Sequence, residues 1–179
     1  VNPYFRTKDA KEVLKEHQIK LIAPVYADTN LENPALPPEI YSVFDDKECF
    51  VVFDVGGGED GTIPLGRYYP YFSREVCDVF FVLNARRLQT ADLTGAKEAY
   101  RDIAAVSRIP ITAIINNTHL KEETTPAMVL EGQELAREVS KEVGGPIAYM
   151  SGKPEILAEL PKEYEAMKFP IHIFIKLMF

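Results

Sequence analysis

The stretch that most constrains the fold is an apolar run that ends in a carboxylate and three glycines. Residues 49–58 read Cys-Phe-Val-Val-Phe-Asp-Val-Gly-Gly-Gly. Aromatic and β-branched residues favour strands, and a run without polar alternation predicts a strand buried on both faces, as in a parallel sheet. We therefore expect residues 50–55 to form a central strand that delivers Asp54 to the carboxyl edge of the sheet, where open α/β proteins bind ligands.

The glycines after this strand suggest a loop that binds phosphate. Because glycine has no side chain, its backbone amide can approach an anion or a metal-bound phosphate closely. In a nucleotide-binding protein this would be a second phosphate motif, with Asp54 holding magnesium through water. The alternative is a strand, one acidic residue and a flexible turn, because short motifs also match by chance.

The rest of the chain alternates apolar runs with amphipathic segments. The expected strands are residues 19–24, 50–55, 79–84, 111–117 and 147–150. The expected helices are residues 8–17, 39–44, 63–75, 91–107 and 126–143, and residues 156–160 are expected to form a short helix or a turn. This alternation predicts an α/β fold with a mostly parallel sheet flanked by helices. A length of 179 residues suits one domain over residues 1–179.

Some local features refine these expectations. Pro70 should kink or break the third helix, and Thr90 should cap the fourth. Residues 26–38 are a proline-rich loop, and the apolar tail 169–176 is either an edge strand or an appendage. The tyrosine-rich segment 67–72 packs in the core or forms a partner surface, and core packing is the more common role for aromatic stripes.

Polar side chains end three of the expected strands. They are Asp54, Asn84 and Asn117. The carboxyl ends of parallel strands lie at one edge of the sheet, so this convergence favours a ligand site there more than any single motif does.

Composition narrows the class of protein further. The net charge of −7 argues against broad nucleic-acid affinity, which needs a basic face. The two cysteines, Cys49 and Cys77, are expected to be buried free thiols, and the three scattered histidines suggest no metal site. No apolar run reaches the length of a membrane span, and no signal-peptide pattern is present, so a cytoplasmic location is expected.

Together these segments resemble a known family. The run 50–58, the strand 79–84 and Ile-Ile-Asn-Asn at 114–117 occur in the order found in P-loop ATPases of the MinD/ParA kind, within the CobQ/CobB/MinD/ParA nucleotide-binding superfamily. The opening residues 1–6 are similar to the segment after that family's Asp-x-Asp strand. The resemblance covers most of residues 1–150 and implies a P-loop NTPase-like fold that binds ATP and Mg²⁺.

The resemblance also implies roles for individual residues near the phosphates. Asp54 corresponds to the aspartate that helps hold magnesium. Gly58 corresponds to the switch-loop glycine whose amide faces the γ-phosphate, and Gly57 lies beside it in the same loop.

Further roles are implied on the side of the base. Asn117 matches best the asparagine that contacts adenine, and Asn116 is the second choice. The loop that begins at Ser151 and ends at Pro154 would flank the base. Asparagine is also common at strand exits because it accepts turn geometry, which is the alternative explanation for both asparagines.

The chain departs from the family at its most specific motif. The family binds phosphates with a Gly-rich loop that carries Lys and Ser or Thr. The nearest string, Gly152-Lys153, has Ile147 where glycine is required and Pro154 where Ser or Thr is required. Either an N-terminal βαβ unit is missing from this chain, or the chain is a natural relative that has lost catalysis.

These observations predict an ATP-binding switch whose intact parent hydrolyses ATP, and this chain alone is expected to be inactive. A homodimer and an unidentified protein partner are expected. The main alternative is a non-catalytic interaction module that keeps the fold. A weaker alternative is a ligase domain of the cobyrinic acid synthase type. A dinucleotide-binding oxidoreductase is poorly supported, although the glycines of residues 56–61 fit the G-x-G-x-x-G spacing.

Overall fold

The computed structural model describes residues 10–23 and 37–174. In these residues the chain forms an α/β fold with a four-stranded, entirely parallel sheet in the order β1-β2-β3-β4. The strands are Phe80–Leu83 (β1), Ala113–Asn116 (β2), Ile147–Gly152 (β3) and Lys168–Pro170 (β4). The expected α/β class and parallel sheet are therefore confirmed, and the tail contributes an edge strand.

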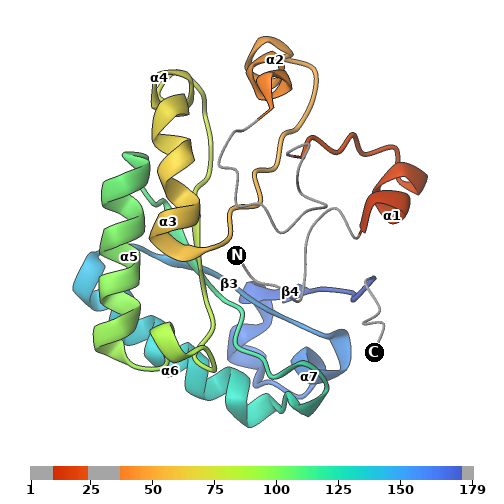
Figure 1. The fold of residues 1–179 in the computed structure, drawn as a ribbon. Helices are drawn as coiled ribbons and strands as arrows, with labels where there is room; N and C mark the ends of the chain where they lie inside the picture. The colour runs from red at the N-terminus through yellow and green to blue at the C-terminus, as the bar shows by residue number, and fades with distance from the viewer. Residues whose placement is uncertain (1–9, 24–36, 175–179) are drawn as a thin grey trace.

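Helices connect the strands and precede them. The α-helices are Lys11–Glu16 (α1), Ser42–Asp45 (α2), Gly58–Thr62 (α3), Tyr69–Phe72 (α4), Leu93–Ser107 (α5), Pro126–Val143 (α6) and Pro154–Ala158 (α7). Short 3₁₀ segments are Pro38–Tyr41 (η2), Ile63–Tyr68 (η3), Leu88–Thr90 (η4), Lys121–Glu123 (η5) and Lys162–Met167 (η6). Figure 1 shows α5 and α6 together at the left and bottom, with α1 and α2 on the opposite side.

The core lies between one face of the sheet and helices α5 and α6. Its first cluster of buried residues joins two strands to both helices: Phe81, Leu83, Ala96, Ile114, Ala136 and Val139. A second cluster continues under α7 and η6: Val129, Met150, Leu157, Leu160 and Tyr164. Removal of these side chains from water is the main force that holds α5 and α6 on the sheet.

The opposite face of the sheet carries exposed apolar side chains. Phe80 and Val82 of β1, Tyr149 of β3 and Phe169 of β4 are all exposed. Tyr149 links the row, because its ring centroid lies 6.3 Å from that of Phe80 and 5.4 Å from that of Phe169. Parallel sheets are normally covered on both faces. We call this row, Phe80, Val82, Tyr149 and Phe169, the open face.

The expected central strand at residues 50–55 is wrong. This segment is irregular, and Phe50 and Val52 are 104% and 92% exposed. Phe53 instead packs against Phe44 and Phe72, with centroid distances of 5.9 and 5.0 Å. Strand character requires a neighbouring backbone to pair with, whereas the aromatic contacts of Phe53 hold the segment beside α2 and α4.

Other elements also differ from their expected bounds. Residues 19–23 are irregular where a strand was predicted, and residue 24 lies outside the described ranges. The helix expected at 63–75 begins at Gly58 and runs through α3, η3 and α4 to Phe72. Figure 1 shows it as nearly one rod beside α5. Pro70 sits in the first turn of α4, where its missing N–H costs nothing.

Caps define the two long helices. Asp92, not Thr90, caps α5, since its carboxylate accepts a hydrogen bond from the amide of Gly95 at 2.8 Å. Thr125 caps α6 by accepting from the amide of Met128. Gly144 ends α6 in the left-handed conformation, with a φ of 76°.

Gly132 of α6 leaves no room for a side chain. A Cβ atom there would lie 2.0 Å from the Thr118 hydroxyl and 2.8 Å from the Asn116 carboxamide oxygen. Alanine favours a helix interior by about 1 kcal/mol over glycine, but overpacking costs about 1–3 kcal/mol or more. We expect Gly132→Ala to destabilise the protein by about 2 kcal/mol or more in urea denaturation.

The control is Gly145→Ala, whose Cβ would lie 3.4 Å from the nearest atom, the Tyr100 hydroxyl. This variant should change the unfolding free energy by less than about 1 kcal/mol. Equal stabilities of the two variants would contradict close contact between α6 and the end of β2.

Candidate functional site

The carboxyl ends of β1, β2 and β3 meet at one edge of the sheet. Register pairs Leu83 with Asn116 and Asn116 with Met150, so the residues that follow these strands emerge next to one another. Three polar side chains occupy this edge: Asn84, Asn117 and Ser151. This is the position at which open parallel sheets bind ligands.

Asn84 ties the loops after β1 and β2 together. Its carboxamide oxygen accepts hydrogen bonds from the amides of Arg86 at 2.9 Å and His119 at 3.3 Å. Its amide nitrogen donates to the carbonyl of His119 at 3.3 Å. Its own carbonyl accepts from the amide of Arg87 and from the Thr90 hydroxyl. The buried Asn84 side chain therefore fixes both loops.

Asn116 is fully buried and faces α6. Its amide nitrogen donates to the Val129 carbonyl at 2.9 Å and to the Gln133 side chain at 3.3 Å. Its oxygen accepts from the amide of Thr118 at 3.1 Å. A buried side chain with both ends engaged anchors the helix to the strand, and a ligand could reach it only by displacing these bonds.

Asn117 and Ser151 form a second pair at this edge. The Ser151 hydroxyl donates to the Asn117 carboxamide oxygen at 2.9 Å. The backbone N–H of Asn117 donates to the Leu83 carbonyl at 2.8 Å. Ser151 is buried and Asn117 is half-buried. Within the described part of the chain, no hydrogen bond engages the side-chain NH₂ of Asn117, so this group can donate to a ligand.

The other three candidate residues, Asp54, Gly57 and Gly58, lie at the start of α3 and in the segment before it. Asp54 is exposed within the irregular segment that precedes α3, and Gly58 is the first residue of that helix. Gly57 and Gly58 have φ angles of 92° and 61°, which favour glycine at both positions. Helix α3 packs mainly against α5 and η3. The sequence suggested that Asp54 ends a strand of the sheet, and in the structure it does not.

The described residues contain no cluster of three or more His, Cys, Asp or Glu side chains suited to a metal ion. For Mg²⁺, this leaves Asp54 as one carboxylate, which would need water and phosphate oxygens to complete the coordination shell.

His119 lies in a positively charged environment. Burial is the main cause that lowers its pKa, and the charges of Arg87 and Lys121 lower that pKa further. Its Nδ1 atom accepts a hydrogen bond from the backbone amide of Lys121 at 3.3 Å. Sequence reasoning missed these three residues, although all of them follow strand ends by only a few positions.

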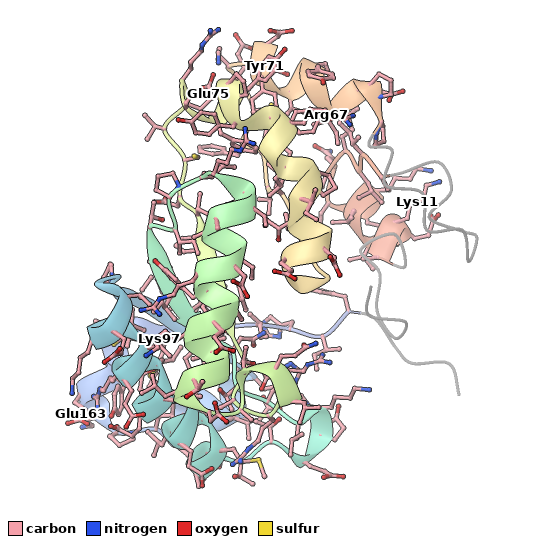
Figure 2. The ribbon with its side chains drawn as sticks, turned by 60° about the vertical axis from the view of Figure 1, so that its left-hand side comes forward. Lys11, Arg67, Tyr71, Glu75, Lys97 and Glu163 are labelled. Atoms are coloured by element: carbon pink, nitrogen blue, oxygen red, sulfur yellow. The ribbon has the colours of Figure 1, made fainter. Side chains whose placement is uncertain are left out.

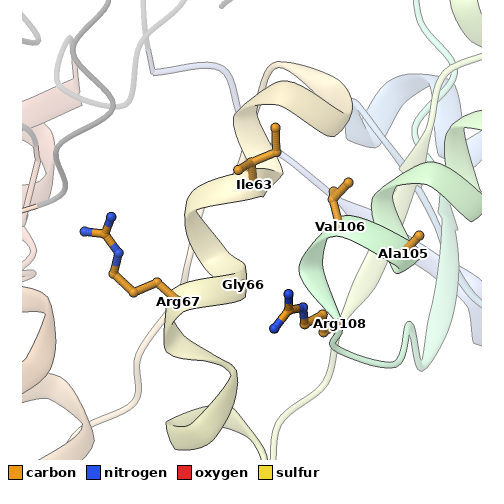
Figure 3. Close-up of a pocket in the computed structure, with 6 residues that line it drawn as sticks. All are labelled: Ile63, Gly66, Arg67, Ala105, Val106 and Arg108. Carbon is orange, nitrogen blue, oxygen red and sulfur yellow. The ribbon is translucent and has the colours of Figure 1, made fainter.

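A shallow hollow lies elsewhere, at the opposite end of α5. Figure 3 shows it between η3 and the C-terminal turn of α5, with Arg108 directed toward Gly66 and Arg67 extending from the other side of its helix. None of the residues that line it follows the carboxyl end of a strand. The hollow is therefore separate from the strand-end site.

Several other predicted features can now be placed. In the tyrosine-rich segment, Tyr68 is buried, whereas Tyr69 and Tyr71 are exposed. Figure 2 places Tyr71 and Glu75 at the end of the molecule opposite Lys97 and Glu163.

The thiol of Cys49 is exposed, contrary to the expected burial, because the segment beside it joins no sheet. The loop 26–38 lies almost entirely outside the described residues.

The chain was compared with known proteins, and it matches no protein-family model, no curated protein and no solved structure. Within the described ranges, no helix has both the length and the apolar character needed to cross a bilayer.

The pKa of His119 predicts a dependence of stability on pH. Above pH 6.5 the imidazole is neutral in both states. As the pH falls through 6.5, the unfolded chain takes up a proton that the folded chain resists, so the free energy of unfolding decreases until His119 also titrates in the folded state.

We expect His119→Gln to lose less stability than the parent between pH 7.5 and pH 5.5, measured by urea denaturation at both values. If the two proteins lose the same amount of stability, the folded-state pKa of His119 is not lowered.

Proposed function

We propose that the chain is the base-binding and switch portion of an ATP-dependent switch protein of the MinD/ParA kind. Asn117 would contact the adenine ring, and Ser151 would orient it. Asp54 would hold Mg²⁺ through water, while Gly57 and Gly58 would belong to the loop that responds to the γ-phosphate. Hydrolysis would then rest on positioning and magnesium electrostatics, without a covalent intermediate.

The observation that carries this proposal is the geometry around Asn117. Its carboxamide oxygen accepts from Ser151, which fixes the plane of the side chain. Its NH₂ group, which makes no hydrogen bond among the described residues, can donate at the edge where parallel sheets bind ligands. An adenine ring presents acceptor nitrogens that such a donor can contact. Asn116 is committed to α6, so Asn117 is the better candidate of the two.

A phosphate-binding loop of the Gly-rich, Lys-containing type does not occur among the 179 residues. Hydrolysis would therefore belong to an intact parent protein that supplies this loop. Within this proposal, the chain by itself binds nucleotide weakly, because the backbone amides and the ammonium group that hold the phosphates are missing.

The test is an NMR titration of the 179-residue chain with Mg·ATP and, separately, with Mg·GTP. The signals monitored are the side-chain NH₂ resonances of asparagine. We expect weak binding, a preference for ATP and a shift of the Asn117 signal. Asn117→Ala should weaken ATP binding about tenfold, the equivalent of roughly 1.4 kcal/mol. Gln89→Ala, which removes an exposed amide from η4, is the control and should have no effect.

Equal shifts with ATP and GTP, or an unchanged affinity after Asn117→Ala, would remove adenine recognition from the proposal. Low-micromolar ATP affinity of the chain alone would contradict the dependence on a separate phosphate loop.

A second candidate function is a non-catalytic interaction module. The open face favours it, because a row of exposed aromatic and aliphatic side chains on a sheet is typical of protein contact surfaces. In this case the polar strand ends would serve only to hold loops in place.

Asp54→Ala in the intact parent separates the two candidates. For an ATP-dependent switch, loss of the magnesium-binding carboxylate should lower ATP hydrolysis at least tenfold, because the metal neutralises charge in the transition state. Nucleotide binding and hydrolysis equal to those of the parent would favour the interaction module. A phosphate-release assay provides the measurement.

A further inference from the structure

Three basic residues lie on two loops at the carboxyl edge of the sheet. Arg87 follows β1, and His119 and Lys121 follow β2. Because β1 and β2 are adjacent and parallel, these loops leave the sheet at the same edge.

Hydrogen bonds link these residues through Asn84. The Arg87 amide donates to the Asn84 carbonyl at 3.0 Å, and the Asn84 side chain contacts both backbone groups of His119. The Lys121 amide donates to the ring of His119. The backbones of Arg87 and His119 are thus hydrogen-bonded to Asn84, and that of Lys121 to the His119 ring, which favours a preorganised site.

The orientation of the imidazole ring suits an anion. Since Nδ1 accepts a hydrogen bond from the Lys121 amide, the neutral ring carries its proton on Nε2. Nε2 can therefore donate to an oxygen of a ligand. His119 as a whole is half-buried.

The cations near His119 differ in their partners. Two neighbouring cations are neutralised, since Arg86 pairs with Glu131 and Lys153 pairs with Glu122. Among the described residues, none of the salt bridges uses Arg87. The charges that act on His119 are those of Arg87 and Lys121, and both lower the pKa of its imidazole.

We propose that Arg87, His119 and Lys121 form a binding site for a phosphate group at the carboxyl ends of β1 and β2. A phosphate offers several acceptor oxygens and up to two negative charges. It thus matches a planar guanidinium, an imidazole donor and an ammonium better than a single carboxylate does. The overall charge of −7 gives no general attraction for anions, so binding depends on this local cluster.

The phosphate could be inorganic or could belong to a nucleotide, and the chemistry of recognition is the same. This inference does not rest on the proposed contact between Asn117 and adenine. The two sites use different side chains, and separate variants test them.

The experiment is an NMR titration of the 179-residue chain at constant ionic strength with inorganic phosphate, with ATP and with chloride as the reference anion. The signals followed are the imidazole resonances of His119 and the guanidinium resonance of Arg87. We expect saturable shifts with phosphate or ATP and none with chloride.

Arg87→Gln and Lys121→Gln should each weaken binding about tenfold, as expected for the loss of one charge-assisted hydrogen bond. Both side chains are exposed, so both variants should fold. The matched controls are Arg74→Gln and Lys141→Gln, which remove exposed cations of the same types elsewhere and should leave binding unchanged.

Saturation by inorganic phosphate would identify a site for the free anion, and saturation by ATP alone would assign the site to a nucleotide phosphate; either supports the proposal. Asn117→Ala should leave binding of inorganic phosphate unchanged even if it removes adenine preference. Equal shifts with chloride, no shift at His119, or equal losses in the control variants would overturn the phosphate site.

Discussion

The structure depends on the burial of one sheet face under α5 and α6. The residues that make this contact alternate along the strands, so Phe81 and Leu83 point into the core while Phe80 and Val82 point away from it. At about 25 cal/mol for each Å² of apolar surface removed from water, a few such side chains outweigh any single hydrogen bond in the fold. The helices and the strand register are fixed by the same contact.

This one-sided arrangement determines where polar chemistry can occur. Helices α5 and α6 both start at the carboxyl edge of the sheet, and the loops that lead into them carry Asn84, Asn117 and His119. Buried amide side chains hold these loops, so the positions of the charged groups near them are set by hydrogen bonds from the interior. A site with this support requires little ordering when a ligand arrives, which preserves binding free energy.

The sequence predicted most of the sheet and the long helices because their patterns reflect local physics. The strands at 80–83 and 113–116 and most of the strand at 147–152 are apolar runs, and α6 is a long amphipathic segment that ends at a glycine. Residues 50–55 have the same strand composition, but composition does not specify a pairing partner. Contacts of Phe53 with the rings of Phe44 and Phe72, on the segments before and after it, decided the outcome there.

The candidate site was predictable only in part, for a related reason. The polar residues at the ends of β1 and β2 were visible in the sequence, and the pairing of Asn117 with Ser151 agrees with their expected proximity. Which of two adjacent asparagines faces the interior depends on strand register, and burial of Asn116 follows from its contact with α6. The grouping of Arg87 with His119 required the tertiary fold, because 32 positions of sequence separate them.

The contact at Gly132 has a mechanical consequence. The backbone of α6 meets the Thr118 side chain with no intervening atoms, so the helix cannot slide or rotate without moving the loop that follows β2. With a rise of about 1.5 Å per residue, the 18 residues of α6 span roughly 27 Å. Val129, Ala136 and Val139 are buried in the core along this length, so a displacement of the loop would strain the packing of α6 against the sheet. The loop after β2 and the core beneath α6 are therefore mechanically coupled through this one contact.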